Sequence, residues 1–215
     1  MKAILKNDFG TKLGIVSSWV ESNTGTVTVI DYNKIQTKSH LISLQAFELK
    51  HKVLSNNTNI ESSWIWRWYI DRIDNLPENL IIHCQLINPS AVTSFGIAGG
   101  QWLDAVEIED NINILHIGTE DDEVMYNRAE NSDLIPNRFK DYLSTSETFT
   151  KYIDYGLKIE IPNLLLGEKI YFHFIVATDL IKPSEYNSDE IDISTWLAVN
   201  QSKSFLDKIF TEKNI

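Results

Sequence analysis

Three tryptophans stand at alternate positions in one short stretch of the chain, as Trp64, Trp66 and Trp68. Successive side chains of a β-strand point to opposite faces, so a strand here places all three rings on one face. Such a face either fills the core between two layers or forms a platform on which sugar rings and other flat ligands stack. The pattern favours the core and leaves the platform open.

Two further aromatic residues lie in or beside acidic sequence. Trp102 follows the glycine-rich residues 96–100, and Tyr126 follows a run of acidic residues. Exposed Trp and Tyr side chains often anchor a partner, because a single ring contributes a large contact area. The platform hypothesis predicts that at least one of the four tryptophans is solvent-accessible. The candidate ligand-binding residues are Trp64, Trp66, Trp68, Trp102 and Tyr126.

The acidic residues are unevenly spread along a chain whose formal net charge is −11. Between Asp104 and Asp133 there are ten acids and a single base, Arg128, so this stretch carries −9. An anionic surface repels phosphate backbones and anionic lipids, which argues against nucleic acid or a membrane as partner. It suits a protein partner with a basic surface, although acidic loops also serve simply as solvated surface. The candidate partner-binding residues are Glu107, Glu109, Asp121, Asp122 and Glu123.

Three histidines, His83, His116 and His173, each stand in the middle of an apolar stretch with strand character. Histidines on three strands can converge on a transition metal inside a jelly-roll. Their spacing gives this no support, since no two histidines are separated by one or by three residues. A lone strand histidine is more often a hydrogen-bonded structural residue. No cofactor is therefore predicted, and these three residues are weak metal candidates.

Calcium is the second metal alternative, because acidic loops supply oxygen ligands. Residues 119–123 could meet a second acidic group formed by Asp179, Asp189, Glu190 and Asp192. Neither stretch has the alternating ligands and central glycine of a calcium-binding loop. Solvated loops are the favoured interpretation.

The elements that must position these residues are mostly strands. A threonine alternation at residues 24–31 indicates a strand with one wet face, paired as a hairpin with residues 12–20. The tryptophan strand spans about residues 61–73, and residues 119–133 are expected to form a polar connection. The other expected strands are 80–87, 102–107, 111–118, 148–161, 169–178 and 195–199. Residues 202–210 have the apolar stripe of a helix.

These elements predict a mainly β chain. We expect one antiparallel β-sandwich or jelly-roll domain over residues 1–215, with a short C-terminal helix. No stretch resembles a signal peptide or a membrane span, and the single cysteine, Cys84, lies in an apolar strand. A cytoplasmic protein is the simplest expectation.

Three functions remain open on this sequence. The first is a non-enzymatic, acidic binding protein that engages a basic protein partner, as inhibitors and immunity proteins do. The second is a carbohydrate or small-molecule binding module that uses a tryptophan face. The third is a jelly-roll enzyme, with or without a metal. A homo-oligomer is compatible with each of them, and the fold class alone does not choose among them.

Overall fold

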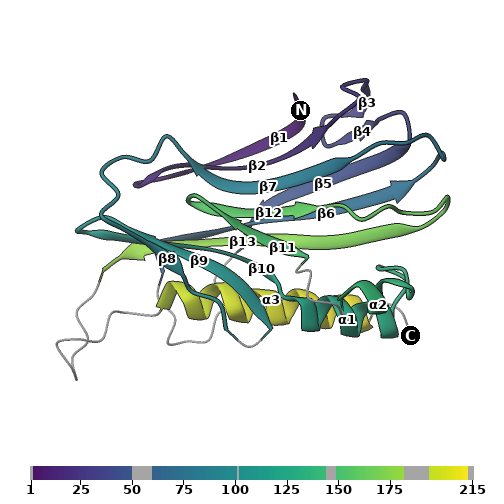
Figure 1. The fold of residues 1–215 in the computed structure, drawn as a ribbon. Helices are drawn as coiled ribbons and strands as arrows, with labels where there is room; N and C mark the ends of the chain where they lie inside the picture. The colour runs from purple at the N-terminus through teal and green to yellow at the C-terminus, as the bar shows by residue number, and fades with distance from the viewer. Residues whose placement is uncertain (1, 50–59, 101, 144–148, 182–193, 213–215) are drawn as a thin grey trace.

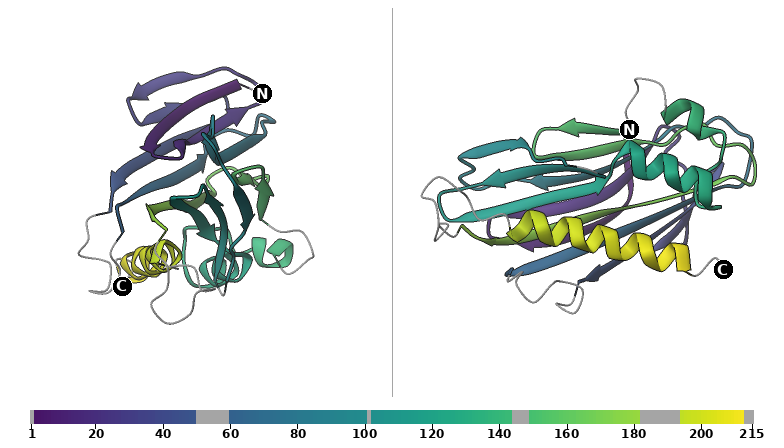
Figure 2. Two further views of the ribbon diagram at one scale, coloured as in Figure 1. Left: turned by 90° about the vertical axis from the view of Figure 1, so that its left-hand side faces the viewer. Right: turned by 90° about the horizontal axis from the view of Figure 1, so that it is seen from below.

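The computed structural model describes residues 2–49, 60–100, 102–143, 149–181 and 194–212. Within these residues the chain is mainly β, with two antiparallel sheets and a C-terminal helix, as the sequence predicts (Figure 1). The two sheets face each other across the main core, and the C-terminal helix lies on the opposite face of the larger sheet (Figures 1 and 2).

Thirteen strands form the two sheets of the described chain. In spatial order, the smaller sheet contains β1 (Lys2–Thr11), β2 (Gly14–Ser22), β7 (Leu80–Ile87), β12 (Gly156–Glu160) and β11 (Thr150–Ile153). The larger sheet contains β3 (Thr28–Asp31), β4 (Lys34–Gln36), β5 (His40–Glu48), β6 (Ser62–Arg72), β13 (Lys169–Leu180), β10 (Asn113–Glu120), β9 (Leu103–Glu109) and β8 (Ser94–Ile97). The helices are α1 (Asp122–Asn131), α2 (Phe139–Leu143) and α3 (Ser194–Glu212).

The main hydrophobic core lies between the two sheets, and the tryptophan strand β6 supplies its largest side chains. Trp66 and Trp68 are both 0% exposed and pack in one cluster with apolar residues of the smaller sheet. Each indole N–H also reaches the smaller sheet. Trp66 Nε1 donates to Asn7 Oδ1 at 2.8 Å, and Trp68 Nε1 donates to Ser18 Oγ at 2.9 Å. The rings therefore fill the core while their polar atoms are satisfied across it.

A second apolar cluster lies on the opposite face of the larger sheet, beneath α3. Ile65 and Ile175 of the sheet pack there with Ala198 and Val199 of the helix. The helix comes so close because Gly118 has no side chain: a Cβ at this position would lie 2.6 Å from Val199 Cγ1. Because apolar layers cover both of its faces, β13 is a nearly continuous apolar run in the sequence.

The helices α1 and α2 close one end of the main core. Met125 and Ala129 of α1, with Phe139 and Leu143 of α2, are buried in the same cluster as the two tryptophans. In the part of the chain that the structure describes, no helix combines the length and apolar character needed to cross a lipid bilayer.

Four of the structural expectations were wrong. Residues 150–160 form two strands instead of one, because β11 and β12 pair as a hairpin. Residues 12–20 and 24–31 do not pair, because β2 pairs with β1 and β7 while β3 pairs with β4 in the other sheet. Residues 195–199 form the start of α3, where Thr195, Ala198, Val199 and Ser202 are all buried at helical spacing. The polar connection expected at residues 119–133 contains the helix α1. The sequence did not predict this helix because its apolar residues show only weak helical periodicity.

A glycine in β12 gives a direct test of this sheet packing. A Cβ on Gly156 would lie 2.2 Å from the carbonyl oxygen of Cys84, whereas a Cβ on Gly10 would meet no atom within 4 Å. Gly156→Ala should lower the free energy of unfolding by about 2 kcal/mol or more, because β7 and β12 must separate. Gly10→Ala should change it by less than about 0.5 kcal/mol. Equal urea midpoints for the two variants would contradict the close approach of these strands.

Candidate functional site

The β9–β10 hairpin and the start of α1 bring several predicted residues to one end of the larger sheet. Asp104 on β9 pairs with Thr119 on β10, and the chain then enters α1. Asp121 caps this helix, since its Oδ1 accepts a hydrogen bond from Val124 N at 2.9 Å. Carboxylates in a first helical turn are stabilised by the helix dipole. We call this surface the acidic corner and define it as Trp102, Asp104, Asp121, Asp122, Glu123, Tyr126 and Tyr152.

The carboxylates of the acidic corner are crowded. Burial raises the pKa of Asp104 to about 6, with further increases from the Asp122 and Asp121 charges, despite a 2.7 Å hydrogen bond from Tyr152 Oη. Burial also raises the pKa of Asp121 and of Asp122. Lys203 of α3 lies close enough to Asp121 to offset part of that increase. The corner therefore carries more negative charge than its own cations neutralise.

Two aromatic rings flank these carboxylates. The Trp102 side chain is 45% exposed, and its backbone adopts a φ of 67° at the entrance to β9. Tyr126 is 36% exposed and lies one helical turn after Glu123 on the outer face of α1. The corner thus combines two exposed aromatic rings with several carboxylates.

The remaining two predicted acids, Glu107 and Glu109, lie apart from this corner. Glu107 and Glu109 lie three and five residues after Asp104 on β9, so their side chains point to the opposite face of the sheet, the face that carries α3. Glu107 Oε2 lies 3.0 Å from His116 Nε2, and His116 Nδ1 lies 2.8 Å from Thr195 Oγ1 at the start of α3. The hydrogen bond from His116 lowers the pKa of Glu107. Glu107, through His116, thus fastens α3 to the sheet, and the predicted acidic surface is divided into two groups.

Of the four candidate tryptophans, only Trp102 has a largely accessible ring. Trp66 and Trp68 lie in the core, and Trp64 is half-buried and stacks on Phe9 with ring centroids 5.3 Å apart. The sequence interpretation missed Trp19, which lies on the outer face of the smaller sheet. Its ring stacks on His83 at 4.6 Å and 4°, so that neighbour already occupies one face of the indole. The described part of β6 therefore offers no tryptophan platform.

The three candidate histidines do not converge. His83 lies on the smaller sheet, whereas His116 and His173 lie on the larger one, at different positions along β10 and β13. Asp179 lies near the end of β13 away from Thr119, and Asp189, Glu190 and Asp192 lie outside the described residues. Among the described residues, no group of three His, Cys, Asp or Glu side chains is arranged to hold a metal ion.

Two buried carboxylates organise the polar interior; the sequence noted one of them only as part of the acidic residues 119–123, and the other not at all. The first is Glu120, at the end of β10. Its Oε1 lies 2.8 Å from Arg128 Nη1 and 2.7 Å from His173 Nδ1, and its Oε2 accepts from Thr119 Oγ1 and His173 N. Burial would raise the pKa of Glu120, but His173 and Arg128 hold it far below its ordinary value. This network ties α1 to the sheet and is closed to solvent.

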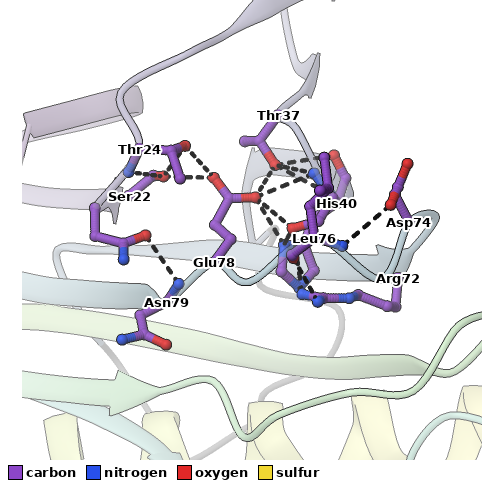
Figure 3. Close-up of polar contacts among 11 residues, drawn as sticks. Ser22, Thr24, Thr37, His40, Arg72, Asp74, Leu76, Glu78 and Asn79 are labelled. Atoms are coloured by element: carbon purple, nitrogen blue, oxygen red, sulfur yellow. Dashed lines mark hydrogen bonds and ion pairs between the residues drawn. The ribbon is translucent and has the colours of Figure 1, made fainter.

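The second is Glu78, in the connection between β6 and β7 (Figure 3). Its carboxylate accepts hydrogen bonds from Ser22 Oγ (2.5 Å), Thr24 Oγ1 (2.7 Å), Ser39 Oγ (2.7 Å) and Thr37 Oγ1. It also lies 3.1 Å from His40 Nδ1. Burial would raise the pKa of Glu78, but the bonds from His40 and the hydroxyls hold it far below its ordinary value.

His40 extends the Glu78 network to a cation. Its Nε2 lies 3.0 Å from Arg72 Nη1, and a guanidinium can only donate. His40 Nε2 must therefore accept, which leaves the Nδ1 proton for Glu78. The network joins β2, the β4–β5 turn and the end of β6, so it links both sheets. All of its members except Thr24 are buried, so it is not an open reactive site.

Comparison of the chain with protein-family models, with curated proteins and with solved structures gave no match.

The Glu78 network can be tested by an isosteric change. Glu78→Gln replaces one acceptor oxygen by an amide that faces the donors Thr37, Ser39 and His40, so the free energy of unfolding should fall by about 2–4 kcal/mol. Asp74→Asn, in the same loop, is the control: its carboxylate accepts only an exposed bond from Leu76 N. The two are compared by urea unfolding at pH 7. Equal effects would show that Glu78 does not hold the sheets together.

The acidic corner predicts an unusual dependence of stability on pH. Because the folded state raises the pKa of Asp104 from 3.8 to about 6, it binds this proton more tightly than the unfolded chain does. The contribution of Asp104 to the free energy of unfolding should thus fall as pH rises from about 4 to about 6. Asp104→Asn should stabilise the protein by about 1 kcal/mol at pH 7, after solvent screening, and have little effect near pH 3.

The control for this change is Asp133→Asn, which removes the same charge from an exposed position. Its effect should be small at both pH values. If Asp104→Asn gave no more stability at pH 7 than Asp133→Asn, the cost of burying the Asp104 charge at the corner would be disproved.

Proposed function

We propose that this chain is a non-enzymatic binding protein that engages a basic surface of a protein partner, as an inhibitor or immunity protein does. The observation that carries the proposal is the acidic corner itself, where carboxylates at the end of the β9–β10 hairpin and in the first turn of α1 lie beside two exposed aromatic rings. Burial raises the pKa values of Asp104, Asp121 and Asp122, so a cation from outside the chain would stabilise their ionised forms. A partner's Arg or Lys would supply that cation.

The surroundings of these carboxylates also suit a protein interface. Trp102 and Tyr126 provide exposed rings beside the acids, and aromatic anchors surrounded by polar groups are typical of binding energy hot spots. The net charge of −11 would steer a basic partner toward the chain and speed association at low salt. In this proposal the two sheets form a β-sandwich scaffold that holds the β9–β10 hairpin and α1 in fixed positions.

A triple variant that keeps the shape of the corner tests the proposal. Asp121→Asn, Asp122→Asn and Glu123→Gln together remove three charges, while asparagine at position 121 still caps α1. The control triple, Asp31→Asn, Asp71→Asn and Asp74→Asn, removes the same charge from β3 and the end of β6. Each protein is immobilised, and the proteins retained from a lysate of its natural source are quantified at about 0.05 M and about 0.5 M salt.

The wild type and the control triple should retain the same basic protein at low salt and release it at high salt. The corner triple should retain much less of it, and association of the purified pair should slow by about tenfold or more. Retention of the same partner by the corner triple at the wild-type level would overturn the proposal, as would a wild type that retains no basic protein.

A further inference from the structure

The strand β5 is paired along its full length on one side only. All of its residues from His40 to Glu48 pair with β6. On the other side, β4 pairs with residues 41–43 alone, and a last backbone bond runs from Leu44 N to Asn33 O at 2.8 Å. Beyond Leu44, the side of β5 that faces away from β6 has no neighbouring strand among the described residues.

The direction of the backbone groups in this free half follows from the strand period. Ile42 faces Ile35 of β4, and Leu44 N also points to that side. Because successive residues direct their N–H and C=O groups to opposite sides, Ala46 and Glu48 direct theirs to the same side as Leu44. In the described chain these groups have no backbone partner. Ala46 and Glu48 thus present donors and acceptors at the spacing of a β-strand.

A groove of about 330 Å³ runs beside this free edge. One wall comes from the edge strand β1 of the smaller sheet, with Leu5, Lys6 and Asn7, and the other includes Leu44 and Ala46. Ala46 lies opposite Trp66 in the β5–β6 pair, and its small side chain leaves room at the rim of the core. The edge is therefore accompanied by a recess that could take a side chain.

We propose that an extended segment of a partner protein adds to β5 as a strand alongside Ala46 and Glu48. This mode of recognition uses backbone bonds for affinity and pockets for alternate side chains for specificity. The residue opposite Ala46 is apolar and enters the recess between Leu5 and Leu44. The residue opposite Glu48 is basic, because Glu48 is exposed and opposite charges stabilise a cross-strand pair.

Charge favours such a segment over a second copy of this chain. Each copy carries −11, and joining two copies at this edge brings acidic chains together. The outermost strands of the larger sheet, β3 and β8, are only four residues long, and short edges of this kind discourage pairing. The free half of β5 instead continues a nine-residue strand. This surface is separate from the acidic corner, and either proposal can fail without the other.

Proline at position 46 tests the inference without breaking the sheet. The N–H of Ala46 makes no bond to β6, so Ala46→Pro removes a donor only from the free edge, where proline is tolerated. Ala46→Ser is the matched control, and Glu48→Lys reverses the charge at the end of the edge. The probe is a displayed library of random decapeptides, selected on the wild type, with affinities of synthetic binders then measured on all four proteins.

The selected peptides should each contain an apolar residue and a basic residue two positions apart. Binding of these peptides should slow hydrogen exchange at the Ala46 and Glu48 amides. Their affinity should fall at least tenfold for Ala46→Pro and for Glu48→Lys and stay unchanged for Ala46→Ser. Failure to select any peptide would overturn the inference, and so would peptides that bind Ala46→Pro as tightly as the wild type. Dimerisation of the wild type that Ala46→Pro abolishes would assign the edge to a second copy instead.

A second experiment changes the peptide instead of the protein, so the inference can still be tested if Ala46→Pro does not fold. N-methylation of a bound peptide at alternate residues removes single donors from the added strand. Methylation at positions facing β5 should abolish binding to the wild type, and methylation at the intervening positions should leave it intact. Equal effects at both sets of positions would overturn strand addition.

Discussion

The packing of two tryptophans between the sheets is the interaction on which the other features depend. Trp66 and Trp68 are fully buried, and their indole N–H groups bond to Asn7 and Ser18 of the opposite sheet. A buried ring contributes apolar area without directional preference, whereas its N–H must find one particular partner. The pair therefore fixes the register of β6 against β1 and β2. It also sets the direction of β13, which pairs with β6 over ten residues.

The ends of this core are held by buried charge. Glu78 joins the smaller sheet to the turn before β5, and Glu120 joins β10 to α1 through Arg128 and His173. Removing one member of such a network leaves the others buried and unpaired, which is much more costly than the net benefit of the network itself. Glu120, through Arg128, holds the start of α1 against the larger sheet and so positions Asp121 and Asp122.

The sequence predicts well what depends on alternation and poorly what depends on distant partners. The tryptophan strand, β7, the β9–β10 hairpin and β13 follow from local periodicity. The pairing of β2 with β7 could not be read, since the residues between them give no signal of which strands become neighbours. Likewise, Glu78 and Glu120 are ordinary acids in the sequence; only the fold shows that one meets four hydroxyl-bearing side chains and the other an arginine and a histidine. The acidic residues of the corner could be listed from the sequence, but the sequence did not show that Glu107 and Glu109 lie apart from Asp121 and Asp122.

The buried and the partly exposed carboxylates differ in a way that bears on the proposed partner. In Glu78 and Glu120 the oxygens are engaged by several donors, which lowers their pKa values and leaves nothing to offer a ligand. Asp104, Asp121 and Asp122 have raised pKa values, so their charge is a cost in the free protein. A fold that secures two deeply buried acids this thoroughly could have neutralised three partly exposed ones. In the proposed complex, a cation of the partner would lie beside these carboxylates, next to Trp102 and Tyr126. The cost of their ionised forms in the free protein would then be offset on binding, which would increase the affinity.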